Sequence, residues 1–321
     1  MSRSPDVKFD NVLVTGATGF VGGRLIERLA MNSGVRLRAL VRHLEKARSL
    51  IAGNVDLVQG DITDRRSLDA ALSDCDLVFH CAALMHDATT DAQVFHRVNV
   101  EGTRNMLEAA LQAGVRRFVH VSSIAVYGTS PREGADETDE YQFGREGYAN
   151  SKIESEQLAL AYHRQRGLPV VVIRPANVYG PRSSFWTVWM IAMIKSGQLS
   201  LIDDGQGMAN PVYIDNLVDA MQLAARHTAA VGEVFVVSDG TKVTWKEFLG
   251  YYARMVGRDS LPSMSRAEAL SKLDPVQVEY WTQTGWFDIT KARRMLGYEP
   301  RVSLAEGMKQ TEQWLRRSGY I

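Results

Sequence analysis

The sequence predicts an α/β protein with a doubly wound parallel sheet, followed by a smaller and mostly helical C-terminal domain. Three observations predict this fold class. Short, β-branched runs alternate with longer segments of helical period through the first half of the chain. Most of these runs are apolar throughout, as is typical of parallel strands that are covered on both faces. After Pro181 the sequence changes to aromatic and Met-rich helical segments.

The individual elements follow in order along the chain. The first strand is expected at residues 11–16 (NVLVTG), and an apolar stripe from Phe20 to Leu29 predicts the helix after it. Further strands are expected at residues 35–41, 55–60, 76–82, 116–123 and 169–175. Helical segments are then expected at 185–197 and 268–281, with one more strand at 232–240. We therefore expect domains at 1–181 and 182–321, with a strand near 233–237 returning to the sheet and a cleft shared between the domains.

Composition limits the classes of function. The chain of 321 residues has 37 Lys plus Arg and 37 Asp plus Glu, so no net field attracts nucleic acid or an anionic membrane. Only Cys75 and Cys81 are present, too few for a secreted disulfide framework, which favours a reducing, cytoplasmic location. No run approaches the roughly 20 apolar residues of a membrane span. These features indicate a soluble protein whose partner is a small molecule.

A glycine-rich loop predicts a dinucleotide site. Gly16, Gly19 and Gly22 follow the first strand directly and open the first helix. Glycines let the backbone approach a pyrophosphate closely, and the helix N-terminus supplies free N–H donors. The alternative is a tight strand-to-helix turn without a ligand.

The end of the second strand indicates which dinucleotide binds. Arg42 and His43 stand where an acidic residue would accept from the ribose hydroxyls of NAD. A guanidinium pairs with a 2′-phosphate, so NADP is favoured. The alternative is that Arg42 stacks on the adenine and admits NAD as well. Asp61, after the third strand, either accepts from the adenine amino group or caps a helix.

Several motifs occur in a fixed order along the chain. They are TGATGFVG (15–22), GDI (60–62), HCAA (80–83), NVEGT (99–103), VSSIAVYG (121–128), YANSK (148–152) and RPANVYGP (174–181). With these motifs the chain resembles the extended short-chain dehydrogenase/reductase family, which contains NAD-dependent epimerases, dehydratases and 3β-hydroxysteroid-dehydrogenase-like reductases. The resemblance covers nearly the whole length. It implies a Rossmann-type domain at 1–181, a substrate-binding domain at 182–321 and an NAD(P)-dependent enzyme.

Tyr148 and Lys152 are the predicted catalytic pair. Residues four apart share one face of a helix, so both side chains can point into one cleft. Lowering a tyrosine pKa from ~10 to ~7 takes ~4 kcal/mol, and an ammonium ~4 Å away supplies roughly that at an effective dielectric of ~20. The resemblance implies that Lys152 also holds the nicotinamide ribose and that Ser123, rather than Ser122, hydrogen-bonds the reacting oxygen. For the pair alone, the alternative is a surface tyrosine and a solvated lysine.

The resemblance also implies the wider site. Beside the three glycines and the catalytic pair, the implied cofactor contacts are Thr18, Phe20, Val21, Arg42, Asp61, Ile62, Ala82, Ala83, Asn99, Pro175 and Val178. Asn99 is expected to be structural rather than a proton donor. The implied substrate neighbours are Met85, His86, Asp87, Ser123, Asn177, Arg182 and Trp186. Family members pair through the helix that carries Tyr148 and the helix at about 91–113, so a homodimer is expected.

Two further patterns concern ligands. Cys75, His86 and the HCAA motif lack the CxxC or HxxxH spacing of a metal site, so no metal is expected. Trp186, Trp189, Met190 and Met193 form one helical stripe, which either packs in the core or lines an apolar pocket.

Three functions remain open from the sequence. The first is a reductase or dehydrogenase that uses released NADP(H), the second a sugar epimerase or dehydratase with tightly held NAD, and the third a noncatalytic dinucleotide sensor. Arg42 favours the first, and the intact catalytic residues oppose the third. Many nucleotide-sugar epimerases carry an arginine that faces the substrate diphosphate, and the resemblance aligns Ala209 with it. A partly apolar, uncharged ketone or alcohol, or an unactivated sugar, is therefore the expected substrate.

Overall fold

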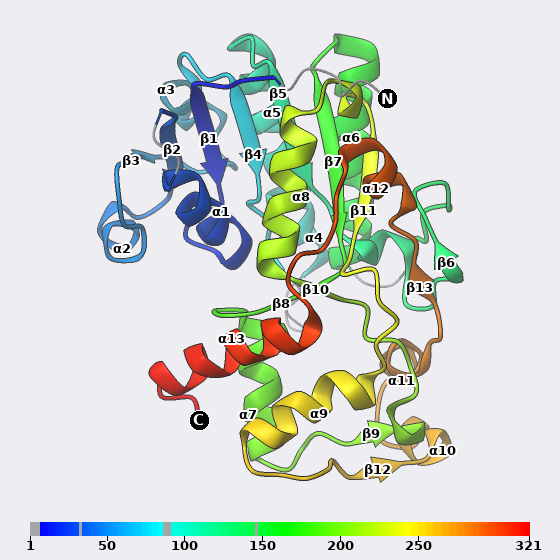
Figure 1. Cartoon of the computed structure of the whole chain (residues 1–321). Helices are drawn as coiled ribbons and strands as arrows, with labels where there is room; N and C mark the ends of the chain where they lie inside the picture. Colours follow the sequence, from blue (N-terminus) through cyan, green and yellow to red (C-terminus); the bar gives the residue numbers. More distant parts are fainter. Residues whose placement is uncertain (1–6, 32–33, 86–90, 145–146) are drawn as a thin grey trace.

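The centre of the protein is a parallel sheet of seven strands (Figure 1). The computed structural model describes residues 7–31, 34–85, 91–144 and 147–321. The strand order is β3-β2-β1-β4-β5-β7-β11, which confirms the doubly wound α/β class. The strands are β1 Asn11–Thr15, β2 Arg36–Val41, β3 Val55–Gln59, β4 Leu77–His80, β5 Arg117–Val121, β7 Val170–Pro175 and β11 Val234–Val237.

Both faces of the sheet are buried, which explains the continuous apolar runs. Val12 and Val14 belong to the core under helices α1 and α8, whereas Leu13 belongs to the core under α5 and α6. The helices around the sheet are α1 Phe20–Ala30, α2 Leu44–Leu50, α3 Asp69–Leu72, α4 Ala92–Phe95, α5 Gly102–Gln112, α6 Gly147–Arg166, α8 Ile214–Arg226 and α12 Thr290–Leu296. A π-helical turn, His96–Glu101, joins α4 to α5 within the long helix expected at 91–113.

The second half of the chain forms a smaller part below the sheet and also returns to it (Figure 1). Its own helices are α7 Met190–Lys195, which continues a π-helical turn Ser184–Trp189, and α9 Trp245–Met255, α10 Arg266–Leu270, α11 Pro275–Thr282 and α13 Leu304–Arg317. Strand β11 and helix α8 belong to the sheet layer, so the chain crosses between the two parts more than once. The domain boundary at residue 181 stays a prediction.

Short parallel strand pairs lie between the two parts and, in the case of β9 and β12, within the smaller part (Figure 1). The pairs are β8 Asn177–Tyr179 with β10 Pro211–Tyr213, β9 Leu201–Ile202 with β12 Ser263–Met264, and β6 Glu133–Ala135 with β13 Trp286–Phe287. One hydrophobic core runs from the sheet face under α1 and α8 to Met190, Trp245 and Phe248 in the smaller part. This shared core fixes the two parts against each other at the carboxyl ends of the strands.

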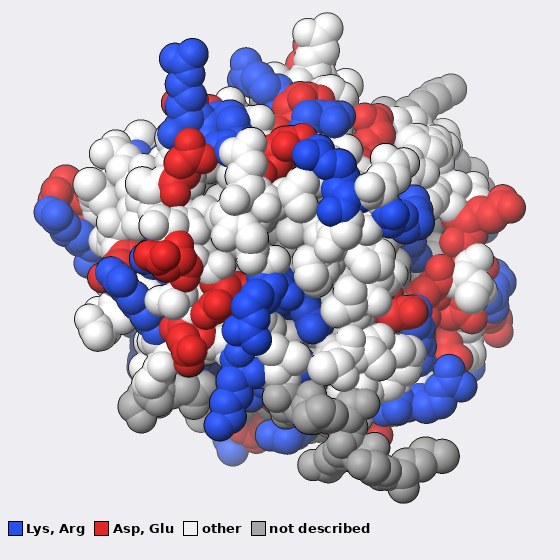
Figure 2. All heavy atoms as spheres, turned by 90° about the horizontal axis from the view of Figure 1, so that it is seen from above, with Lys and Arg blue, Asp and Glu red and all other residues white. Residues whose placement is uncertain are grey.

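The surface is mixed in charge. In the view of Figure 2, basic and acidic side chains are interspersed over the face that is shown. Among the described residues, none of the helices has the length and apolar character needed to cross a membrane.

Candidate active site

A large cavity lies between the carboxyl ends of the parallel strands and the smaller part. Its volume is about 1930 Å³. The predicted site residues that line it are Gly16, Thr18, Gly19, Phe20, Val21, Gly22, Arg42, Asp61, Ile62, Ala82, Ala83, Met85, Ser123, Tyr148, Lys152, Pro175, Asn177, Val178 and Trp186. Asn99 and Arg182 are absent from this lining, and His86 and Asp87 lie outside the described residues.

The glycine loop after β1 is built from close backbone contacts. Gly16 has a φ of 67°, and a Cβ there would lie 2.8 Å from the Ala82 backbone nitrogen, at the end of β4. A Cβ on Gly22 would lie 2.4 Å from the Gly16 carbonyl oxygen. Gly19 begins helix α1 without a side-chain cap, and the first turn, Phe20 to Gly22, lines the cavity. Uncapped N–H groups beside a tight loop fit a dinucleotide pyrophosphate.

One end of the cavity is formed by the residues that follow β2 and β3. Arg42 is exposed at the end of β2 and lines the cavity, and no ion pair holds it within the described part of the chain. Asp61 also lines the cavity, and its carboxylate accepts from the Thr63 backbone nitrogen and hydroxyl, each at 2.9 Å. Asp61 therefore caps a local turn rather than a helix.

Helix α6 presents Tyr148 and Lys152 to the end of β5. The Lys152 ammonium donates to the Val121 carbonyl at 2.7 Å, and the lysine side chain is almost fully buried. Ser123 follows β5 and caps a 3-10 turn, where its oxygen accepts from the Ala125 backbone nitrogen at 3.1 Å. All three predicted residues thus reach the same end of the cavity.

Burial decides the protonation of this pair. It raises the pKa of the Tyr148 phenol above its usual value of 10.0, while a hydrogen bond with Ser123 lowers it. It lowers the pKa of Lys152 from 10.5 to about 8, and the nearby Glu156 carboxylate raises it. The expectation that Lys152 lowers the pKa of Tyr148 is therefore not the dominant effect in this structure. The Lys152 ammonium donates to a backbone carbonyl, and the Tyr148 side chain is half-buried in the cavity lining.

Asn99 and Arg182 have structural partners. The Asn99 amide donates to the Leu84 carbonyl at 3.0 Å and to the Ser151 hydroxyl at 2.9 Å, and its oxygen accepts from the Leu84 nitrogen at 2.7 Å. It clamps the segment after β4 to α6, which agrees with the structural role expected for it but keeps its side chain out of the cavity.

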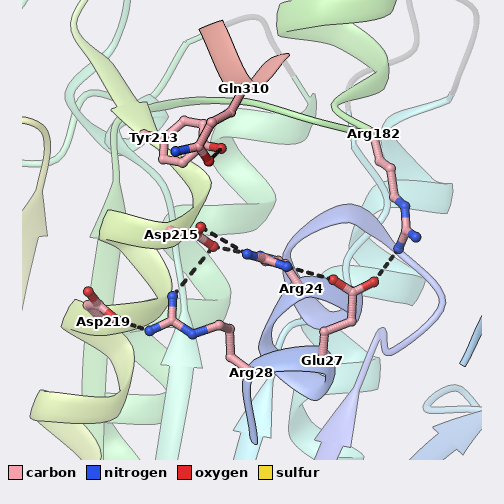
Figure 3. Close-up of polar contacts among 8 residues, drawn as sticks. All are labelled: Arg24, Glu27, Arg28, Arg182, Tyr213, Asp215, Asp219 and Gln310. Carbon is pink, nitrogen blue, oxygen red and sulfur yellow. Dashed lines mark hydrogen bonds and ion pairs between the residues drawn. The ribbon is translucent and has the colours of Figure 1, made fainter. Parts of the chain in front are cut away.

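Arg182 belongs to an ion-pair network on the outside of α1 (Figure 3). Its guanidinium pairs with Glu27 at 2.5 Å, and Glu27 also pairs with Arg24 at 2.9 Å. Arg24 continues the network to Asp215 on α8, at 2.5 Å. The Arg182 guanidinium therefore binds Glu27 on α1, and Arg182 does not line the cavity.

The aromatic stripe divides between core and cavity. Met190 is fully buried, whereas Trp186, Trp189 and Met193 line the cavity. The sequence patterns did not assign a further part of the lining, which comes from Val276, Tyr280 and Trp281 on α11. The Tyr280 ring stacks on the Trp186 ring, with their centroids 6.2 Å apart. The only sequence signal was the apolar, aromatic character of the segment 268–281.

Asn177 ties Tyr280 on α11 to the segment before β10. Its amide donates to the Ala209 carbonyl at 2.7 Å and to the Tyr280 hydroxyl at 2.8 Å. Among the described residues, no group of three or more His, Cys, Asp and Glu side chains could hold a metal ion.

Comparisons with known proteins agree with this geometry. A family model described as the NAD dependent epimerase/dehydratase family matches residues 12–238. The chain is 31% identical to a UDP-glucose 4-epimerase from Vibrio cholerae, covering 94% of each chain. It is 30% identical to a 4-hydroxy-2-methyl-3-oxo-4-farnesyl-3,4-dihydroquinoline-1-oxide ketoreductase from Stigmatella aurantiaca, covering 94% of this chain and 95% of the relative.

A solved structure has the same fold with the dinucleotide present. The dTDP-glucose 4,6-dehydratase from Streptomyces venezuelae, determined with NAD bound, is 28% identical and superposes with a TM-score of 0.80 over 96% of this chain and 97% of that one. The match to the family model, the relatives and the shared fold together show that this chain belongs to the NAD-dependent epimerase/dehydratase family of extended short-chain dehydrogenases/reductases.

Proposed function

We propose that the protein is an NAD(P)-dependent oxidoreductase that transfers hydride at a secondary alcohol or ketone carbon of a small, uncharged and partly apolar substrate. The observation that carries this proposal is the meeting of the uncapped glycine loop with Ser123, Tyr148 and Lys152 in one cavity. A dinucleotide-dependent reaction at a C–O bond requires a tight loop and a helix N-terminus for the cofactor, and an acid/base pair for the proton.

The three side chains have separate roles in this proposal. Tyr148 gives a proton to the carbonyl oxygen or takes it from the alcohol, and Ser123 donates a hydrogen bond that polarises the C–O bond. Lys152 holds the nicotinamide ribose and supplies positive charge beside the phenol. The bound dinucleotide supplies or accepts the hydride. The high pKa of the buried phenol makes it a proton donor in the free protein, and Ser123 is the group that lowers this pKa.

The walls of the cavity support an uncharged, partly apolar substrate. Trp186, Met193 and Tyr280 line the cavity, and the rings of Trp186 and Tyr280 stack with their centroids 6.2 Å apart. Ala209 stands where many nucleotide-sugar epimerases have an arginine, and it is buried, with only 1% of its surface exposed. The nearby Arg182 is occupied by Glu27, so neither position offers a cation to a diphosphate.

Arg42 supports a preference for NADP. Its guanidinium lies at the rim of the cavity, at the end of β2, where a 2′-phosphate of the adenosine ribose would lie. In the described residues it has no competing carboxylate partner, so it is free to pair with a phosphate.

A sugar epimerase or dehydratase with tightly held NAD is the second candidate, since relatives with those names align over nearly the full chain. Denaturing the purified protein and identifying the released dinucleotide distinguishes the two. Stoichiometric NAD would favour the epimerase or dehydratase, and an empty or NADP-containing protein the oxidoreductase.

The catalytic proposal is tested by Tyr148→Phe. Steady-state assays with NADPH or NADH and a panel of ketones are expected to show a kcat at least about a hundredfold lower, because only the proton-transfer group is lost. Cofactor affinity should change little. Near-normal turnover in this variant would refute the assignment of Tyr148.

A further inference from the structure

Helix α6 contacts the end of β5 with three side chains at successive turns. Tyr148 hydrogen-bonds with Ser123, and the Lys152 ammonium donates to the Val121 carbonyl at 2.7 Å. One turn further, the Glu156 carboxylate accepts from the Ser122 hydroxyl at 2.5 Å. The third member of this series, Glu156, does not line the cavity, and neither motif nor mechanism gave it a role.

Glu156 is completely buried, with 0% of its side chain exposed. The Arg174 guanidinium binds its Oε1 with Nε at 3.0 Å and with Nη2 at 2.6 Å, and the Tyr141 hydroxyl donates to the same oxygen at 3.0 Å. A further nitrogen of Arg174 donates to the Tyr127 hydroxyl at 2.5 Å. The carboxylate thus joins α6 to the ends of β5 and β7, directly behind Lys152.

The charges in this region explain why a carboxylate is needed. Lys152 and Arg174 are two buried cations, and Glu156 is the buried anion that accompanies them. Without it, two positive charges would remain in apolar surroundings, which strongly disfavours the charged form of the one that can lose a proton. Arginine does not deprotonate in proteins, so the proton would leave Lys152.

The other titratable groups that face Lys152 do not replace Glu156. His80 and His120 come from β4 and β5, and burial together with the Lys152 charge lowers the pKa of each imidazole, so both are neutral. Cys81 follows β4, and burial raises the pKa of its thiol to about 12. Tyr148 is neutral near pH 7, because burial raises its pKa as well.

We propose that Glu156 is a positioning residue that keeps Lys152 protonated and aligned for dinucleotide binding, with Arg174 setting the strength of this effect. The proposal rests on the proposed function, because it uses Lys152 as the group that holds the nicotinamide ribose. Glu156 touches neither substrate nor cofactor and acts only through Lys152 and the strand ends.

The test is the pH dependence of dinucleotide binding, measured by the fluorescence of NADPH, or of NADH if it binds more tightly, between pH 7 and 10. In the wild type, affinity should fall as Lys152 loses its proton. Glu156→Gln should move this fall at least about one pH unit lower, because the compensating charge is gone. Arg174→Met should move it higher, because the carboxylate then acts on Lys152 alone.

Opposite directions are the signature of a charge effect, since damage to packing would weaken binding at every pH without moving the curve. Glu156→Asp keeps the charge, and its curve should remain near that of the wild type. Glu154→Gln is the matched control, because Glu154 lies on the same helix but is exposed and pairs with His96. It should move nothing.

An unmoved curve in Glu156→Gln, or shifts of both variants in one direction, would overturn the inference and leave the proposed function intact. If Glu156→Gln does not fold, the other two variants decide. The inference is supported if the fall in affinity moves to higher pH in Arg174→Met and stays at the wild-type pH in Glu156→Asp. Any other pair of results overturns it. A wild type whose affinity does not fall with pH would instead refute the role given to Lys152, and the inference with it.

Discussion

Replacing Lys152 by methionine should make the protein more stable at pH 7 and abolish tight dinucleotide binding. Lys152 is 3% exposed, and its pKa is lowered from 10.5 to about 8. A lysine whose pKa is lower in the folded than in the unfolded chain destabilises the fold wherever both states carry the charge. Methionine has a similar length and no charge, so it removes this penalty.

The magnitude follows from the size of the shift. Each pKa unit corresponds to ~1.4 kcal/mol, so the shift of Lys152 costs about 3 kcal/mol of folding free energy below pH 8. Methionine leaves the Val121 carbonyl without its donor, a loss of about 1 kcal/mol. The net gain at pH 7 is then about 2 kcal/mol, or roughly 3 °C in Tm for a chain of 321 residues.

The sign reverses with pH, and this reversal is the decisive observation. Between pH 8 and 10.5 the unfolded chain binds the lysine proton and the folded protein does not, so the wild type gains stability as pH rises. Urea unfolding should therefore give the variant a higher free energy of unfolding than the wild type at pH 7. At pH 10 its free energy of unfolding should equal or fall below that of the wild type.

The control is Lys46→Met, which changes an exposed lysine on α2 and should leave unfolding nearly unchanged. A Lys152→Met protein that is less stable by the same amount at both pH values would refute the reasoning, because the lysine would then contribute packing instead of a buried charge. Unchanged dinucleotide affinity in that variant would separately refute its role in binding.

Three further outcomes are expected. Arg42→Asp should lower NADP affinity roughly ten- to a hundredfold and shift preference toward NAD, as measured by cofactor titration; a wild type that already prefers NAD would contradict this role of Arg42. Asp239→Asn should stabilise the protein at pH 8 but not near pH 4. Burial raises the Asp239 pKa from 3.8 to about 7, so ionisation of this carboxyl above pH 4 costs the folded state stability. Equal urea midpoints for the variant and the wild type at pH 8 would contradict this prediction. Light scattering at micromolar concentration should give a dimer mass, and a monomer mass would exclude the expected pairing through α6 and the helix at 91–113.

The sheet and the dinucleotide loop could be predicted from the sequence because they depend on local signals. A strand such as β7 is apolar at every position except Arg174, since both of its faces are buried. The spacing of Gly16, Gly19 and Gly22 reflects backbone contacts within a few residues and with β4. The separation of Tyr148 and Lys152 follows directly from the helical period.

The remaining features depend on contacts between distant segments. Arg182 follows a motif that borders the substrate in relatives, but Glu27 on α1 draws its side chain away. Which face of a helix lines a cavity depends on the neighbours that pack against the helix. Trp186 lines the cavity, whereas Met190 on the same stripe is buried. The pKa of Tyr148 depends on the burial of its side chain, and the pattern of apolar residues in the sequence does not reveal that burial.

The basic side chains of the described cavity lining bear on the substrate. Within the described lining, the basic side chains are Arg42, Arg97, Arg132 and Lys152. Arg42 lies at the end of β2, and Lys152 is buried against β5. Arg132 pairs with Asp139 at 2.6 Å and with Asp136 at 3.5 Å. Like Arg42 and Lys152, Arg97 has no ion-pair partner among the described residues, and it is exposed on the π-helical turn between α4 and α5.

Nucleotide sugars are therefore expected not to bind. A diphosphate placed against the stacked rings of Trp186 and Tyr280, whose centroids lie 6.2 Å apart, would lose hydration without gaining a cation from the described residues of this aromatic cluster, at a cost of several kcal/mol per unpaired charge. Isothermal titration with UDP, UDP-glucose and UDP-glucuronate should show no binding at micromolar concentrations, in the presence and absence of NADP. Micromolar binding of any of the three would favour the epimerase candidate, and its loss in Arg97→Gln but not in Arg182→Gln would identify Arg97 as the phosphate partner. Retention of binding in both variants would place the diphosphate on backbone donors and refute the argument from missing cations.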